Sequence, residues 1–270
     1  MNKVMRPIDW SFPPRPVKRE VISREPASGT GKDQPPLLFV HGARHAAWCW
    51  EPWLDLAAER GWSAHAVSLR GHGGSEGHER LRRTPLRDFV HDVVQAAVRL
   101  PRQPVLIGHS LGALLVERAL AKYPARGAAL IAPAPLDNGI TATIQRLRDQ
   151  PSDVLVTAIG KPLPMRHETL FSGLTPDESA PFLARLGGES TLATYQLTLP
   201  HRPTPTRAPI FVAGTPDDAL VPASDVEKTA HFYGVEPHWF PGLGHDLMLD
   251  RGNEQVLDTL LDWVEKEVCR

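Results

Sequence analysis

Residues 103–121, with the sequence QPVLIGHSLGALLVERALA, form the most informative stretch of the chain. The apolar run at 103–107 contains β-branched residues and is typical of a buried strand. Residues 113–121 are rich in alanine and leucine and predict a helix. Between them lies Gly-His-Ser-Leu-Gly, so the sequence predicts a sharp strand-to-helix turn with Ser110 at its apex.

The residue types around Ser110 explain how such a turn exposes a hydroxyl group. A serine held in a strained backbone conformation stands clear of the sheet, and its close-packed neighbours must then lack a Cβ, which favours glycine. The amide of Leu111 opens the predicted helix, where N–H groups lack partners and the helix dipole is positive. That amide would stabilise a developing oxyanion. Ser110 is therefore a candidate nucleophile.

Length and composition restrict the class of protein. The chain has 270 residues, enough for a full core, and a formal net charge of −1, which gives no sign of nucleic-acid or acidic-membrane binding. Cys49 and Cys269 give neither a disulfide framework nor zinc-ligand spacing. No apolar run reaches the ~18 residues of a transmembrane helix, and no signal peptide is evident. We therefore expect a cytoplasmic protein.

A second informative stretch follows Leu37–Val40, an all-apolar run typical of a central strand covered on both faces. The chain continues as HGARHAAWCW at 41–50, and RGHGGS at 70–75 follows the next predicted strand. A strand ending in His-Gly, a Trp-x-Trp loop and the GHSLG turn further along together resemble the α/β-hydrolase fold family. The pattern is similar to the small esterase and lysophospholipase-like members of that family.

The resemblance implies an α/β architecture with a mostly parallel, doubly wound sheet of the eight-stranded type, flanked by helices. It assigns residues 1–135 and 207–270 to this core. Residues 136–206, where predicted helices at 140–149, 175–186 and 191–197 alternate with Pro and Gly, resemble the helical cap that the family inserts before the acid-bearing strand. The family's second oxyanion donor is a backbone N–H just past His-Gly. Here that donor is Ala43, paired with Leu111.

Residues after the predicted cap complete a catalytic constellation. A serine nucleophile needs a base, the base needs an acid that holds its tautomer, and in this fold they follow in the order Ser, acid, His. His245 lies in Gly-His-Asp after the last predicted strand, where the family's base lies. Asp218 matches the family's Asp-x-Leu-Val-Pro segment and is the preferred acid. Counting from the end of the preceding strand favours Asp217 instead, and Asp137 is a third option.

These residues predict acyl transfer on a small-molecule ester with an apolar acyl group, with Ser110 attacking the carbonyl and His245 moving the proton. No metal or cofactor is required. The same residues would serve perhydrolase or haloperoxidase-like chemistry, or hydrolysis of lactones, thioesters or amides, because the fold alone does not fix the reaction. A non-catalytic ligand receptor is a further alternative, which the intact Ser-Asp-His order disfavours. We expect a monomer or weak dimer.

Apolar residues from two regions are candidates for the substrate pocket. Trp48, Trp50 and Trp53 either pack in the core or wall the pocket. The predicted cap contributes residues that suit an acyl pocket or the small core of a lid equally well: Leu155, Leu163, Met165, Leu170, Phe171 and Phe182. His41 is expected to brace the loop before Ala43 through hydrogen bonds.

Local signals predict where several elements begin and end. Thr84 is the expected N-cap of a helix with Pro85 in its first turn. Ser224 and Glu227 are spaced as a capping box. An edge strand is expected at 17–23 and the last strand at 235–240.

Overall fold

The computed structural model describes residues 13–26, 34–136, 164–197, 199, 203 and 205–269. Their strands form one sheet in the order β1-β3-β2-β4-β5-β6-β7, in which only the β1–β3 pair is antiparallel. The mostly parallel sheet is confirmed, with seven strands in the described residues where the eight-stranded type was expected. The strands are β1 Val21–Arg24, β2 Leu37–Val40, β3 Ala64–Val67, β4 Val105–His109, β5 Gly127–Ile131, β6 Ile210–Gly214 and β7 His238–Trp239.

Helices cover both faces of the sheet, and β2 shows why. Its side chains alternate, so Leu37 and Phe39 join the apolar cluster under α1 and α10, while Leu38 and Val40 join the cluster under α2, α3 and α9. All four are buried, as predicted for a central strand. The helices of the core are η2 Ala47–Trp50, α1 Glu51–Glu59, η3 His78–Arg83, α2 Leu86–Arg99, α3 Leu111–Leu120, α9 Ala223–Tyr233, α10 Asn253–Trp263 and η4 Val264–Val268.

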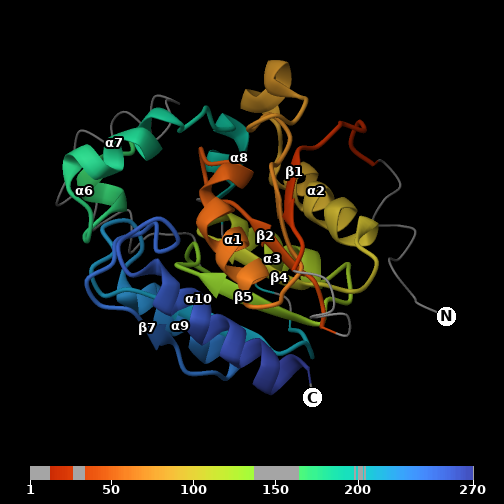
Figure 1. Cartoon of the computed structure of the whole chain (residues 1–270). Helices are drawn as coiled ribbons and strands as arrows, with labels where there is room; N and C mark the ends of the chain where they lie inside the picture. The colour runs from red at the N-terminus through yellow and green to blue at the C-terminus, as the bar shows by residue number, and fades with distance from the viewer. Residues whose placement is uncertain are drawn as a thin grey trace.

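Three further helices of the described residues lie between β5 and β6 in the chain, and we call them the inserted helices: α6 His167–Leu170, α7 Pro176–Ala184 and α8 Thr191–Leu197. Figure 1 shows them in green to teal, from the upper left to the top centre of the view. The predicted helices at 175–186 and 191–197 are thereby confirmed. The predicted helix at 140–149, Leu155 and Leu163 lie outside the described residues.

Two predictions about helix ends were wrong. The N-cap of α2 is Pro85, because the Thr84 hydroxyl instead donates to a carbonyl of the preceding 3₁₀ helix η3. The N-cap of α9 is Pro222, which places Ser224 inside the first turn, so no capping box forms with Glu227. In both cases the proline fixes where the helix begins, one residue or more away from the polar side chain.

The two edge strands are shorter than predicted. The first is Val21–Arg24 and not 17–23, because the backbone of Lys18 and Glu20 bonds to the loop after β3 instead of to a strand. The last is limited to His238–Trp239. In the described part of the chain, no helix combines the length and the apolarity needed to cross a membrane.

Candidate active site

The strand-to-helix turn around Ser110 has the expected strain. Ser110 joins β4 to α3 with φ 51° and ψ −116°, a conformation that L-residues rarely adopt. A Cβ at Gly108 would collide with the Gly112 carbonyl, and one at Gly112 would collide with the Val40 carbonyl of β2. The helix begins at Leu111, just before the alanine- and leucine-rich stretch at 113–121, so the Leu111 amide lies at its N-terminus as expected.

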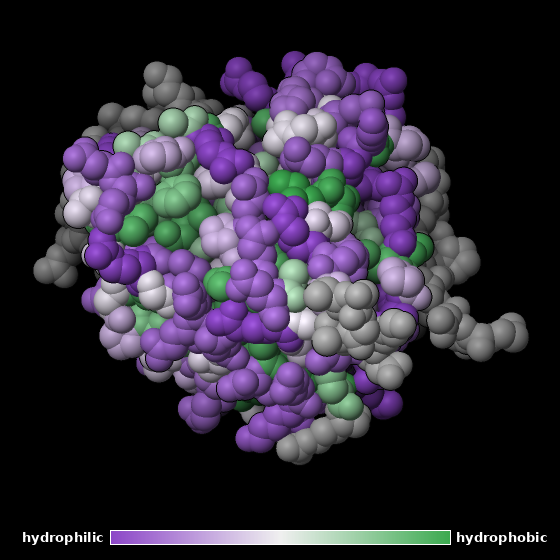
Figure 2. All heavy atoms as spheres, viewed as in Figure 1, coloured by the Kyte–Doolittle hydropathy of each residue, from purple (hydrophilic) through white to green (hydrophobic). Residues whose placement is uncertain are grey.

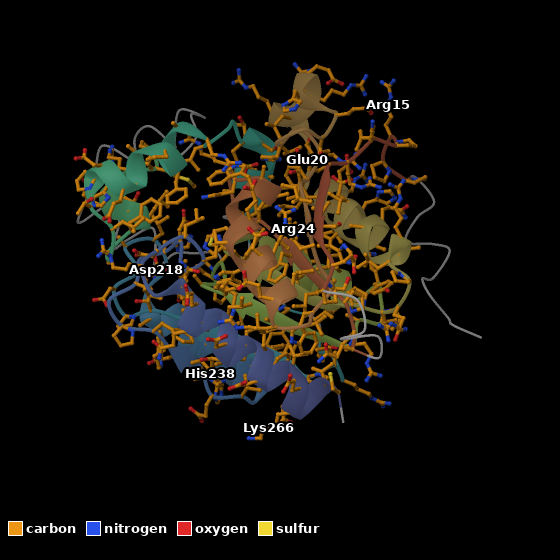
Figure 3. The ribbon with its side chains drawn as sticks, viewed as in Figure 1. Arg15, Glu20, Arg24, Asp218, His238 and Lys266 are labelled. Carbon is orange, nitrogen blue, oxygen red and sulfur yellow. The ribbon has the colours of Figure 1, made fainter. Side chains whose placement is uncertain are left out.

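His245 and Asp218 meet at the ends of neighbouring strands, His245 after β7 and Asp218 after β6. The His245 Nδ1 donates to Asp218 Oδ2 at 2.7 Å, and both side chains are buried. The other oxygen of Asp218 accepts the N–H groups of Leu220 and Val221 at 2.7 and 2.9 Å. Figure 3 shows Asp218 on the side of the core near α6 and α7. This pairing holds the proton of the neutral His245 ring on Nδ1.

The second candidate acid, Asp217, does not contact His245. Asp217 is exposed and its Oδ2 accepts the N–H of Gly242 at 2.7 Å, so it serves the turn before His245 rather than the imidazole. Asp137 lies outside the described residues.

His109, within the elbow motif, ties the loop of His245 to the nucleophile strand. Its Nε2 donates to the backbone carbonyl of His245 at 3.0 Å, and the two rings lie 4.7 Å apart. Burial and the neighbouring His245 lower the pKa of His109 to about 3, so its ring is neutral. Sequence reasoning did not assign this role to His109, although the residue adjoins Ser110.

Hydrogen bonds brace the loop after β2, as expected of His41. Its Nδ1 donates to the Gly42 carbonyl at 2.8 Å, while its Nε2 accepts the Leu69 N–H at 3.0 Å. Burial lowers the pKa of His41 well below its ordinary value, which keeps the acceptor nitrogen unprotonated. Neither the Ala43 N–H nor the Leu111 N–H has a hydrogen-bond partner among the described residues. Two amides beside Ser110 are thus available to an incoming oxygen.

A buried histidine–aspartate pair connects the two loops that flank Ser110. His45 Nδ1 bonds the Ala43 carbonyl at 2.9 Å, and its Nε2 lies 2.9 Å from Asp246, the residue after His245. Burial by itself raises the pKa of Asp246, but His45 and the neighbouring His109 and His245 outweigh it, so the pKa lies below its ordinary value. Asp246 is therefore a buried carboxylate that joins the two sides of the site.

Asp250 fastens the inserted helices to the loop that carries His245. Its carboxylate accepts the N–H groups of Ser172, Gly173 and Gly244 at 2.7–3.1 Å. A further bond runs from the Asp246 N–H to the Leu170 carbonyl at 2.9 Å. The segment after α6 is thus held against the end of the sheet.

Aromatic side chains line the contact between the core and the inserted helices. Trp48 stacks with Phe182 of α7, with ring centroids 6.5 Å apart, and Phe182 lies 6.0 Å from Phe171. Trp50 and Trp53 are fully buried in the core, so of the three tryptophans only Trp48 faces the inserted helices. In Figure 2, apolar atoms gather beside α6 and α7, where these helices meet the core.

The donor atoms of His109, His245 and Asp246 lie within 4.8 Å of one another, a spacing that a metal ion could use. However, His109 Nε2 already donates to a carbonyl and His245 Nδ1 to Asp218. These bonds occupy one ring nitrogen of each histidine, whereas His109 Nδ1 and Asp246 Oδ1 are buried without a hydrogen-bond partner among the described residues.

Comparison with known sequences identifies the family. Residues 37–259 match the model of the alpha/beta hydrolase family. The chain belongs to this family. Among curated relatives, the monoacylglycerol lipase of Mycolicibacterium smegmatis is 27% identical over 84% of this chain and 87% of its own length. The pyrethroid hydrolase of Sphingobium wenxiniae is 30% identical over 35% of this chain.

Several of the curated relatives align over only a part of their length; the matched segment spans 34% of the pyrethroid hydrolase. The α/β-hydrolase fold itself is shared along nearly the whole chain. A monoglyceride lipase from Saccharomyces cerevisiae superposes with a TM-score of 0.74 at 14% identity, covering 93% of this chain and 92% of that one. An esterase from Thermogutta terrifontis gives 0.69 at 17% identity, covering 93% and 94%.

Proposed function

We propose that this α/β hydrolase is a serine esterase that cleaves carboxylic esters through an acyl-enzyme on Ser110. The observation that carries the proposal is the buried 2.7 Å hydrogen bond between His245 and Asp218, on strand ends beside the strained Ser110 turn. The names of the relatives, which include a monoacylglycerol lipase and a probable esterase, support ester chemistry.

In this mechanism His245 takes the proton of Ser110 as the hydroxyl attacks the ester carbonyl. Asp218 orients the imidazole and stabilises its cationic form. The N–H groups of Ala43 and Leu111 bind the oxyanion of the tetrahedral intermediate. His245 then protonates the leaving alcohol, and a water molecule repeats the sequence on the acyl-enzyme.

The substrate is proposed to carry an apolar acyl or alcohol group. Trp48, Phe171 and Phe182 form a continuous aromatic contact between the core and the inserted helices. Such a surface favours an apolar group by burial of its area, roughly 25 cal/mol per Å². The one charged group placed on this aromatic surface among the described residues is Arg185, which lies over the Trp48 ring at 4.5 Å and is paired with Glu51.

The test is intact-mass analysis after treatment with a fluorophosphonate, which reports an activated serine without knowledge of the substrate. We expect one adduct on the wild type and none on Ser110→Ala, with Ser224→Ala as a control that keeps the adduct. A panel of p-nitrophenyl esters of increasing acyl length, with matched amides, lactones and thioesters, then sets the reaction class. A folded wild type that forms no adduct and cleaves no ester would overturn the proposal.

A further inference from the structure

The segment between α7 and α8 contacts the loop that carries Ala43. Gly187 N–H donates to the Arg44 carbonyl at 2.8 Å, and Arg44 Nε donates back to the Gly187 carbonyl at 2.9 Å. The Arg44 N–H donates to Glu189 Oε2 at 2.9 Å. Because Arg44 directly follows Ala43, these bonds act on the peptide next to the proposed oxyanion donor.

The four polar groups of two successive peptides show how the donor is oriented. In the Ala43–Arg44 peptide, the carbonyl is bonded by His45 and the N–H by Glu189. In the Gly42–Ala43 peptide, His41 bonds the carbonyl. The Ala43 N–H is the one group of the four without a partner among the described residues. The other three bonds therefore fix its direction.

Arg44 is held in a conformation that needs such support. Its φ is 65°, in the left-handed region that residues with a side chain avoid. Strain of this kind persists only where surrounding contacts over-determine the backbone, and it concentrates at functional sites. Here the contacts come from Glu189 and Gly187, which lie more than 140 positions further along the chain.

The Glu189 side chain is a buried carboxylate that hydrogen bonds hold in place. It is 9% exposed, its Oε1 accepts the Ser190 N–H at 2.6 Å, and His72 Nε2 lies 3.5 Å from its Oε2. Burial by itself raises the pKa of Glu189, but the nearby His72 and the N–H groups of Ser190 and Arg44 outweigh it, so the pKa is below its ordinary value. Each carboxylate oxygen thus has a fixed N–H donor.

We propose that Glu189 is a positioning residue for the oxyanion hole: its carboxylate holds the Arg44 amide and thereby aims the Ala43 N–H at the reacting carbonyl, an inference that rests on the proposed function. Glu189 touches no reacting atom. Through this bond, the segment between α7 and α8 is connected to the loop that carries one oxyanion donor.

Two substitutions grade the effect. Glu189→Ala removes both acceptors, and we expect kcat to fall by about 10²-fold, toward the loss seen when one oxyanion donor is deleted. In Glu189→Gln one of the two N–H groups must face an amide NH₂ instead of an oxygen, so we expect an intermediate loss of about tenfold. KM should stay within about twofold, because the lost interaction belongs to the transition state.

A second readout separates positioning from general damage to the fold. A trifluoromethyl ketone adds to Ser110 and places an oxyanion in the hole, so its Ki should rise in the variants by the same factor as kcat falls. Circular dichroism and thermal unfolding check that each variant is folded. Glu178→Gln is the matched control: Glu178 is on α7, its ion pair with Arg251 at 2.7 Å is exposed, and we expect unchanged kcat and Ki.

Folded Glu189 variants with wild-type kcat and Ki would overturn the proposal. So would an equal loss in Glu178→Gln, which would indicate a general disturbance of the inserted helices. A rise in KM alone would also overturn it, because that result assigns Glu189 to substrate binding. If the wild type itself neither binds the ketone nor cleaves esters, the proposed function fails and this role fails with it.

Discussion

The two sides of Ser110 are supported by different parts of the chain. On the base side, His245 and Asp218 follow neighbouring strands of the core and bond each other directly at 2.7 Å. On the oxyanion side, Ala43 also follows a core strand, but the strained residue after it is held by Glu189 from outside the core. In the proposed mechanism the core supplies all the reacting groups, while the inserted helices help to orient one of them, the Ala43 N–H.

The largest effect is expected on the base side. Asp218→Asn should lower kcat by about 10⁴-fold, because an amide cannot hold His245 in the productive tautomer. Asp217→Asn is the matched control and should leave kcat nearly unchanged, because the Asp217 side chain contacts the Gly242 amide instead. Steady-state kinetics on one ester would decide between them. A greater loss in Asp217→Asn would exchange the roles of the two aspartates.

A smaller effect is expected where the inserted helices meet the base loop. Asp250→Asn replaces one carboxylate oxygen by an NH₂ that cannot accept the N–H groups of Ser172, Gly173 or Gly244. We expect kcat to fall by up to about 10²-fold, because small displacements of a catalytic group are costly. Asp258→Asn, in an exposed ion pair with Arg60, is the control. Equal rates in both variants would show that the base side needs no support from the inserted helices.

The bridge between the two sides should matter more for stability than for rate. His45→Ala leaves Asp246 as a buried carboxylate without its main partner, and we expect the free energy of unfolding to fall by about 3–5 kcal/mol. Adding Asp246→Asn removes the buried charge and should restore part of that loss, which a double-mutant cycle in urea would measure. Additive losses would mean that the two side chains do not interact.

The smallest effect on the rate is expected at Glu117, a buried residue of α3 away from both sides. Burial raises its pKa to about 8, although Tyr233 donates to it at 3.3 Å. The folded state thus keeps a proton on Glu117 that the unfolded chain releases near the ordinary pKa of 4.5. The contribution of Glu117 to stability is therefore fully present below that pH and is lost as the pH rises through about 8.

Glu117→Gln removes this titration. We expect the variant to be more stable than the wild type near about pH 9, by on the order of a few kcal/mol, and equally stable near about pH 4. Urea unfolding at both pH values measures the difference, and kcat should be unchanged. Glu236→Gln, at an exposed site, is the control. A pH-independent difference would show that Glu117 does not titrate in this range.

A local motif predicted the strained turn at Ser110, and chain order with the family resemblance predicted that Asp218 and His245 lie close together, as the structure shows. Gly108 and Gly112 lie where the backbone of neighbouring segments leaves no room for a Cβ. Asp218 and His245 follow β6 and β7, which are neighbours in the sheet. The supports could not be predicted. Glu189 and Asp250 act across 145 and 78 positions, respectively, so their partners depend on how the inserted helices lie over the core.

Errors at helix ends have a similar origin. Thr84 and Ser224 are good capping residues by type, yet neighbouring structure decides whether their hydroxyl groups meet an open amide. The 3₁₀ helix before Thr84 takes its hydroxyl, and Pro222 starts α9 before Ser224.

The way Asp250 holds the inserted segment bears on how this protein could change during evolution. Asp250 binds backbone amides of Ser172 and Gly173, and almost any residue offers the same amide. Position 173 itself must remain glycine, because a Cβ there would lie too close to Asp250 Oδ1. Side chains of the aromatic contact, such as Phe182, can therefore be substituted while Asp250 still binds the amides of Ser172 and Gly173. A library of variants in the inserted helices would therefore test new substrates while the loop that carries His245 keeps its position.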